Sequence, residues 1–256
     1  MKVKNIFNKI KNFYHAKIAP LIIGDKFLVN CPCCGWKGKN FLSSGKRHNV
    51  LCPNCGSFER HRLYYLYLKN TIPTDIKIKI LHFAPEKVIT NLFKSYSNAE
   101  YLSVDINPKA AMMQADITNL PFNDNSFDII FCSHVLEHIV DDNKALKELF
   151  RVLKPDGFAI IQVPIKDEFN GKKINQTFED SNITSPQDRE KFFGQSDHVR
   201  VCGRDYSDRF KTAGFKVEIN KFIDNFTVSD IKKFGLLPED DSCTETEGWI
   251  YYCTKE

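Results

Sequence analysis

The amino-acid sequence predicts an α/β fold, in which a seven-stranded, mostly parallel sheet carries helices on both faces and follows a small N-terminal zinc ribbon. Two observations support this prediction. From about residue 76 onward, short β-branched runs alternate with amphipathic stretches, as in successive strand–helix–strand units. Ahead of them stand two Cys-x-x-Cys pairs. The length of 256 residues suits one α/β domain plus a small module.

The composition is that of an ordinary globular protein. Hydrophobic residues make up 42% of the chain and charged residues 27%, which excludes disorder for most of it. The formal net charge of +4 neither demands nor excludes nucleic acid. The longest apolar runs, such as 18–23 and 127–132, are too short to span a bilayer. Because no apolar signal core begins the chain and cysteines occur as Cys-x-x-Cys pairs, we expect a cytoplasmic protein.

Residues 1–24 form a basic, amphipathic N-terminal arm. Its lysines surround apolar side chains at helical spacing, namely Ile6, Phe7, Ile10, Phe13 and Tyr14. Such a face packs on its own protein or on a second subunit, which would make a homodimer, or it lies on an anionic membrane surface. We favour the packing interpretation.

Residues 25–70 are expected to form the zinc ribbon and an exit helix. The ligands are predicted to be Cys31, Cys34, Cys52 and Cys55, because each pair is followed by a glycine that permits a tight knuckle. Cys33 is an additional thiol within the first knuckle. Four thiolates close the coordination shell, so the metal would be structural. The alternative is a set of free or disulfide-linked cysteines. The helix is expected at 57–69.

Residues 71–256 alternate strands and helices. The expected strands are 76–83, 101–106, 113–117, 127–132, 158–163, 215–222 and 248–254. Helices are expected from 86 to about 96, from 141 to 153 and from 204 to 213. The segment Lys154-Pro-Asp-Gly157 is predicted to stop the second of these helices.

The ligand crevice of an open parallel sheet lies beyond the carboxyl ends of its strands. The residues there are 83–86, Asp105, Asp116 and 133–138. Asp105 ends the second strand about 20 residues after the first strand-to-helix turn, where a carboxylate accepts hydrogen bonds from the ribose of an adenosine cofactor. This pattern indicates a nucleoside-containing cofactor.

Three segments, 115–122, 126–138 and 148–157, resemble class I S-adenosylmethionine-dependent methyltransferases of the type 11 group. The resemblance covers about residues 76–255 and implies a Rossmann-like fold with S-adenosylmethionine as cofactor. It further implies that Asp105 holds the ribose and Asp116 the adenine amino group, with the Ile117 amide beside it. Ser133 and His134 would form the floor of the site.

One departure from that group lies after the first strand. The usual glycine-rich turn is replaced by His82-Phe83-Ala84-Pro85-Glu86. Because Ala84 is small and Glu86 can meet the ammonium group of the cofactor, we expect residues Phe83, Ala84, Pro85 and Glu86 to bind it. A degenerate fold that binds no cofactor is the alternative.

His134-Val-Leu-Glu-His138 matches the inverted zinc-protease pattern H-x-x-E-H. The context argues against a protease, because His134 directly follows a buried strand and no downstream carboxylate ligand is evident. We instead expect His134 to line the crevice, where it orients or deprotonates the acceptor.

The insertion at 165–206 is expected to bind the acceptor, since polar loops on an α/β scaffold usually carry substrate. Together with the ribbon, it resembles bacterial surface-polysaccharide methyltransferases. For a sugar hydroxyl, His134 or His198 would be the general base. For a phosphate or phosphoramidate, Arg189 and Arg200 would form a charge clamp. Further candidate substrate contacts are Glu179, Asp180 and Asp197. The alternative is that Asp197, His198 and Arg200 only anchor the loop.

Two function classes follow. The first is an O-methyltransferase acting on a small polar acceptor, namely a sugar or nucleotide-linked precursor of a capsule or surface polysaccharide. The second is an RNA or protein methyltransferase, because ribosomal-RNA guanine methyltransferases also join a cysteine ribbon to this fold and the ribbon would then bind nucleic acid. Catalytic residues are predicted to be His134, His198 and Arg200 in the first class.

Overall fold

The structure is a computed structural model and describes residues 14–18, 28–45, 47–174, 176–238 and 245–255. Contacts divide the chain into two units. The ribbon unit comprises residues 1–72 and 221–248, and the sheet unit comprises residues 73–220 and 249–256. Apart from one short helical turn, η1 (Tyr14–Ile18), the predicted N-terminal arm lies outside the described residues.

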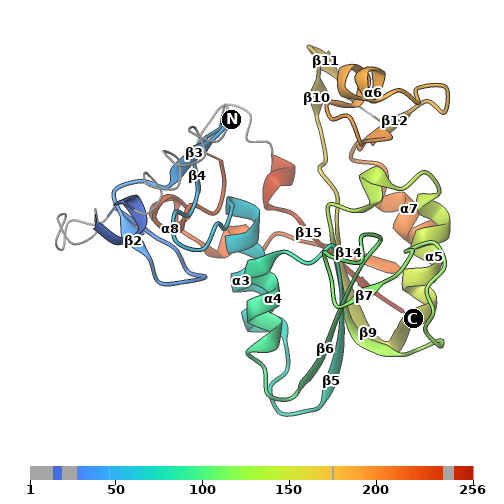
Figure 1. Ribbon diagram of the computed structural model, residues 1–256, viewed down its shortest axis with the longest axis horizontal. Helices are drawn as coiled ribbons and strands as arrows, with labels where there is room; N and C mark the ends of the chain where they lie inside the picture. The colour runs from blue at the N-terminus through green and yellow to red at the C-terminus, as the bar shows by residue number, and fades with distance from the viewer. Residues whose placement is uncertain (1–13, 19–27, 46, 175, 239–244, 256) are drawn as a thin grey trace. The chain divides into compact units, whose positions relative to one another are not determined.

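The sheet unit contains the expected seven-stranded sheet (Figure 1). Its order is β14 (Lys216–Asn220), β15 (Ile250–Thr254), β9 (Leu153–Gln162), β8 (Phe127–Ser133), β5 (Ile78–Phe83), β6 (Ala99–Asp105) and β7 (Met113–Gln114). Only β15 among these strands runs antiparallel to its neighbours. The predicted fold class is therefore confirmed: the sheet is mostly parallel, and its strands follow the alternation read from the sequence.

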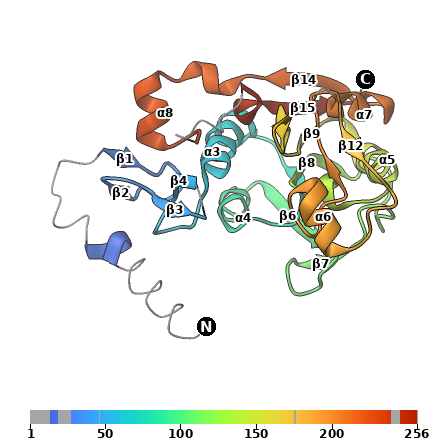
Figure 2. The ribbon, with the colours of Figure 1, turned by 90° about the horizontal axis from the view of Figure 1, so that it is seen from above.

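Helices cover both faces of this sheet (Figure 2). On one face, Phe93 of α4 (Lys87–Lys94) makes edge-to-face ring contacts with His82 and Phe131. On the other face, α5 (Asp142–Val152) and α7 (Tyr206–Thr212) pack with Ile130 into the main hydrophobic core. Phe131 and Ile130 are adjacent in β8 and face opposite ways, because side chains alternate along a strand. Both faces are buried, as the continuous apolar run in β8 requires.

The segment Lys154–Gly157 is predicted to stop the preceding helix, and α5 does end just before it, at Val152. The strand that follows starts earlier than predicted, because β9 begins at Leu153 and includes this segment. Phe127 pairs with Leu153, and the register then shifts before Ile129 pairs with Phe158. A Cβ at Gly157 would lie 2.6 Å from the backbone oxygen of Asp128. The glycine is therefore explained by close approach of the neighbouring strand rather than by a helix cap.

The insertion after β9 is more ordered than the sequence suggested. It contains a small hairpin of β10 (Glu168–Phe169) and β11 (Lys172–Lys173), and a pair formed by β12 (Phe178–Glu179) and β13 (Arg200–Val201). Between them lies α6 (Pro186–Phe193), which is capped by Ser185 and ends at Gly194 in the left-handed conformation. Since the insertion follows directly on β9, it starts at the carboxyl edge of the sheet.

Two short hairpins and several helical segments make up the described part of the ribbon unit. β1 (Val29–Asn30) pairs with β2 (Lys37–Gly38), and β3 (Leu42–Ser44) pairs with β4 (Arg47–Leu51). The predicted exit helix is α3 (Glu59–Thr71). The unit also includes η3 (Phe222–Asn225), α8 (Val228–Phe234) and η4 (Glu245–Gly248).

The grouping of 221–248 with the ribbon differs from the single domain 71–256 expected from the sequence. Its physical reason is a set of contacts to α3: the Tyr67 and Phe222 rings lie 5.3 Å apart, and buried Arg62 donates to the Gly235 carbonyl. These partners are far apart in sequence, so no local pattern predicts them. No helix within the described ranges is long and apolar enough to cross a membrane.

Candidate functional site

The turn after β5 has the backbone shape expected of a ligand-binding turn, although it lacks glycine. Ala84 has a φ of 44°, in the left-handed region that favours glycine, and its amide donates to the Val104 carbonyl. Glu86 then precedes α4, with its Oε2 3.8 Å from Nε2 of fully buried His82. Burial lowers the pKa of His82 despite the carboxylate. A non-glycine residue held in this conformation indicates that the turn geometry matters.

The two predicted cofactor carboxylates end up at adjacent strand ends. Asp105 closes β6 and accepts a hydrogen bond from the Asn107 amide at 2.7 Å. Asp116 follows β7, is exposed, and accepts hydrogen bonds from both the amide and the hydroxyl of Thr118. These bonds lower the pKa of Asp116, so it is ionised near neutral pH. Ile117 beside it is buried.

The loop that carries Asp116 is fixed from α5. Glu148 accepts a hydrogen bond from the Leu120 amide and pairs with Arg151, and this pairing lowers the pKa of Glu148. Arg151 in turn donates to the carbonyl oxygens of Leu120 and Phe122. The Glu-x-x-Arg part of the 148–157 motif therefore holds the loop in place rather than contacting a ligand.

Two buried polar atoms at the carboxyl edge have no hydrogen-bond partner among the described residues. Ser133 and Gln162 are paired across β8 and β9 at their last positions, and each is 3% exposed. Ser133 Oγ and Gln162 Nε2 both lack a partner there. Burying unpaired polar groups is costly, so these atoms indicate that a polar ligand completes the site. The residues thus fit a cofactor at this edge.

His134 follows Ser133 in a left-handed conformation, with a φ of 55°. Its amide donates to the Gln162 carbonyl, and its Nδ1 lies 3.1 Å from Oε1 of Glu137. Glu137 is almost fully buried, whereas His134 is about one-third exposed. The only helical turn of the H-x-x-E-H segment is η2 (Leu136–His138), which excludes His134. The two histidines therefore do not share a helix, as expected from the sequence.

The structure also brings together a group that sequence reasoning missed. Ligand atoms of Glu137, His138 and His198 all lie within 4.8 Å of one another. The His138 and His198 rings meet edge to face at 4.8 Å, and burial lowers the pKa of His198. The histidines come from η2 and from the far end of the insertion. The only sequence signal was the H-x-x-E-H spacing, which supplies two of the three residues.

Arg200, predicted to take part in a charge clamp, is held by protein groups on several sides. It is 2% exposed and donates to the carbonyl oxygens of Leu136, Ile139 and Val140 and to the carboxylate of Glu179. Its guanidinium also lies 3.5 Å from the buried Asp142. With its donors engaged by protein groups, Arg200 anchors the insertion to the segment after η2. These contacts favour the loop-anchor alternative over the charge clamp for this residue.

The other predicted acceptor residues each have different partners. Glu179 is bound between Arg200 and Arg209, so it belongs to the same anchor. Asp180 is exposed and accepts from Asn182. Arg189 is partly buried on α6 and makes one long contact, 3.5 Å, to the Ile183 carbonyl. Only Asp197 lies beside the histidine group, with Oδ2 3.5 Å from His138 Nδ1.

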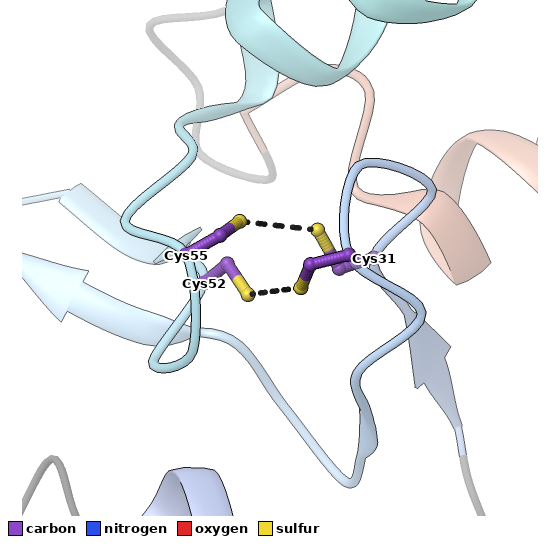
Figure 3. A group of neighbouring side chains, drawn as sticks. Cys31, Cys52 and Cys55 are labelled. Atoms are coloured by element: carbon purple, nitrogen blue, oxygen red, sulfur yellow. Dashed lines mark hydrogen bonds between the residues drawn. The ribbon is translucent and has the colours of Figure 1, made fainter. Parts of the chain in front are cut away.

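The four predicted ribbon cysteines converge, as Figure 3 shows for Cys31, Cys52 and Cys55. The Sγ atoms of Cys31 and Cys55 are 3.7 Å apart, and those of Cys34 and Cys52 are 3.8 Å apart. All four lie within 4.8 Å of one another. Gly35 and Gly56 are left-handed, and their amides donate to the Cys31 and Cys52 carbonyls. These knuckles fit a four-thiolate zinc site.

A buried arginine supports this cluster. Arg62 is fully buried and donates to the carbonyl oxygen and hydroxyl of Ser57, whose Oγ lies 3.3 Å from the Sγ atoms of both Cys31 and Cys55. Burial lowers the pKa of Arg62, and neighbouring thiolates oppose that shift. A cation next to four thiolates is favourable because a tetrathiolate zinc site carries net negative charge. The sequence indicated only that this helix end is basic.

The chain is similar to known proteins over part of its length. Residues 65–161 match the family described as "Methyltransferase domain". An uncharacterized protein of Methanocaldococcus jannaschii is 39% identical over 94 residues, which are 34% of this chain and 41% of that protein. A demethylmenaquinone methyltransferase of Lactobacillus johnsonii is 35% identical over 88 residues, 34% of this chain and 31% of that enzyme. The chain thus spans less than half of these curated relatives.

Among solved structures, the cyclase SpnF aligns over 97% of this chain and 95% of its own, with a TM-score of 0.51 and 12% sequence identity. At this identity the similarity concerns the fold alone. The fold therefore hosts different chemistries, and an activity must be argued from the site.

Proposed function

We propose that this protein is an S-adenosylmethionine-dependent O-methyltransferase acting on a small polar acceptor. Its residues 65–161 match a methyltransferase-domain family, and its sheet is mostly parallel and seven-stranded. One observation carries the proposal furthest. At the carboxyl edge of β8, the buried carboxylate of Glu137 contacts the partly exposed ring of His134. Nearby, Ser133 Oγ and Gln162 Nε2 are buried without a hydrogen-bond partner among the described residues. This places a candidate proton acceptor where the cofactor is expected.

Asp105 and Asp116 are the residues that would hold S-adenosylmethionine. Asp105 presents a carboxylate to the ribose hydroxyls, and ionised Asp116 accepts from the adenine amino group, with Ile117 beside it. Phe83, Ala84, Pro85 and Glu86 supply the turn near the amino-acid part, where the Glu86 carboxylate complements an ammonium group. When bound, this cofactor supplies an electrophilic methyl group on a sulfonium.

His134 is proposed as the general base. Its Nδ1 faces the Glu137 carboxylate, an arrangement that favours a proton on Nδ1 and leaves Nε2 as a proton acceptor. An acceptor hydroxyl that gives its proton to Nε2 becomes the oxygen nucleophile, and the protein's remaining task is to align it and exclude water. His198 is the second candidate base. Its burial and lowered pKa keep it neutral.

The insertion at 165–206 would bind the acceptor. It begins at the carboxyl edge, and its exposed polar side chains include Asp180 and Asp197. A sugar or nucleotide-linked precursor of a surface polysaccharide is the acceptor class we propose, since such molecules offer many hydroxyls to polar loops. Because Arg200 is engaged in anchoring, a hydroxyl acceptor with a histidine base is favoured over an anionic acceptor held by an arginine clamp.

The four ribbon cysteines would hold one structural Zn²⁺ ion. The geometry leaves no ligand position open, so the ion would stabilise the ribbon unit and take no part in methyl transfer.

The test is methyl transfer from radiolabelled S-adenosylmethionine with zinc-loaded protein. Two separate reactions are run. One contains a pool of sugar nucleotides and phospho-nucleotides, and the other contains unmodified total RNA. We expect label in the small-molecule pool and its loss with His134→Gln. Label in RNA, with binding that weakens steeply as salt rises, would instead support an RNA methyltransferase that uses the ribbon as its grip. Label in neither would refute the acceptor class.

A further inference from the structure

We infer that Glu137, His138 and His198 form a second metal site, which binds a divalent transition-metal ion at the carboxyl edge of the sheet unit. It is separate in sequence and chemistry from the cysteine cluster, since its donors are two imidazoles and one carboxylate. His138 ends the 126–138 segment that resembles methyltransferases, but it is not among the predicted catalytic, cofactor-binding or acceptor-binding residues.

The geometry is close to that of a bound site. The three ligand atoms lie within 4.8 Å of one another. Ligands about 2.1 Å from a common ion at angles between octahedral and tetrahedral values are roughly 3.0 to 3.5 Å apart. Rotations of side chains are enough to close the difference, because the His138 and His198 rings already meet edge to face.

A second observation comes from the carboxylate itself. Glu137 is 1% exposed, and its Oε1 lies within hydrogen-bond distance, 3.1 Å, of His134 Nδ1. Its Oε2 is buried and has no hydrogen-bond partner in the described part of the chain. The nearby buried arginine, Arg200, is engaged by Glu179, Asp142 and three carbonyl oxygens instead. An unpaired buried carboxylate oxygen is expensive, and a cation would compensate it.

The surroundings also orient the ligands. His138 Nδ1 lies 3.3 Å from the Asp197 carbonyl and 3.5 Å from its carboxylate, which leaves Nε2 available to a metal. Metal-binding histidines usually have their second nitrogen held in this way. The Val199 amide donates to the Glu137 carbonyl, so a hydrogen bond joins the two segments that supply the ligands, η2 and the insertion. The ligand set therefore depends on the folded insertion.

Two imidazoles and a carboxylate suit Zn²⁺, Co²⁺, Fe²⁺ or Mn²⁺, and three protein ligands leave positions open. If the proposed function holds, these positions select acceptors that present two neighbouring oxygens, such as vicinal hydroxyls. This substrate class rests on the proposed function, whereas the metal site does not.

The experiment measures Co²⁺ binding to untagged protein whose cysteine cluster has been loaded with zinc. Equilibrium dialysis and visible absorption are recorded without cofactor or acceptor. We expect one Co²⁺ per chain, retained zinc and an absorption spectrum without thiolate charge transfer, since the new ligands contain no sulfur. His138→Gln and Glu137→Gln should each weaken binding at least tenfold. His48→Gln, which changes an exposed histidine of the ribbon unit, should bind as the wild type does.

His138 is about one-third exposed, so its variant tests the site even where a buried substitution unfolds the protein. No binding by the wild type, or equal binding by wild type and His138→Gln, would overturn the inference. Because the readout needs no methyl transfer, failure of Co²⁺ binding leaves the proposed function standing. Failure of methyl transfer with Co²⁺ bound refutes the function and not the site.

Discussion

Replacing Arg200 by methionine should destabilise the sheet unit strongly. Arg200 is buried, bonds to three carbonyl oxygens, and pairs with Glu179 and Asp142. Methionine keeps much of the apolar stem but removes every donor. The substitution leaves the buried Asp142 carboxylate with fewer counter-charges and the carbonyl oxygens without this partner.

The magnitude follows from these contacts. Removing one partner of a buried ion pair costs about 3–5 kcal/mol, because the other charge stays buried. Part of the charge on Asp142 is still met by Arg209 and Tyr206, so we expect the lower half of this range. For a domain of this size, about 3–4 kcal/mol lowers Tm by roughly 6–16 °C.

Urea unfolding followed by circular dichroism measures the free energy of unfolding. Arg189→Met is the matched control, since Arg189 was also predicted to contact substrate but makes only one long contact. Its effect should stay within about 0.5 kcal/mol. If Arg200→Met lost less than about 1 kcal/mol, or no more than the control, the anchoring role would be refuted.

Three further outcomes are expected. Metal analysis should show that Cys52→Ser loses one zinc ion per chain relative to the wild type and that Cys33→Ser loses none; equal zinc content in the two variants would contradict the four-cysteine site. His134→Gln should lower kcat by roughly 10²–10⁴-fold with unchanged affinity for S-adenosylhomocysteine, as loss of a general base predicts; an unchanged kcat would exclude that role. Pairing with Arg151 lowers the pKa of Glu148 in the folded protein below its unfolded value of about 4.5. This pairing therefore stabilises the fold above the unfolded pKa, and its contribution is lost as the pH falls through the folded pKa. Glu148→Gln should therefore be destabilised more at pH 7 than at acidic pH, and a difference in unfolding free energy that stays constant as the pH falls would argue against the charged pairing.

Much of the fold follows from local patterns. The strands β5, β6, β8 and β9 are short segments rich in apolar residues, and their alternation with helices predicts a parallel sheet. The start of β9 could not be predicted, because the glycine at position 157 is required by the close approach of the neighbouring strand β8 and not by a turn. The membership of 221–248 in the ribbon unit depends on Arg62 and other distant partners.

The candidate site divides in the same way. The cysteine knuckles and Asp105 were predictable, since short spacing or a strand end fixes where they lie. The anchoring of Arg200 and the meeting of His138 with His198 were not, because they depend on how the insertion folds back on the segment after η2. A charged residue in a polar loop gives no local sign of whether it binds a ligand or the protein itself.

We propose that the carboxyl edge of the sheet unit binds S-adenosylmethionine through Asp105. Calorimetric titration of S-adenosylhomocysteine into the wild type and into Asp105→Asn tests it most directly, with Asp156→Asn, on an exposed residue of β9, as the control. We predict one site per chain, unchanged in the control and weakened at least tenfold in Asp105→Asn. Absence of binding by the zinc-loaded wild type would contradict a cofactor site at the carboxyl edge. Equal affinity in Asp105→Asn would contradict the role of Asp105 in that site.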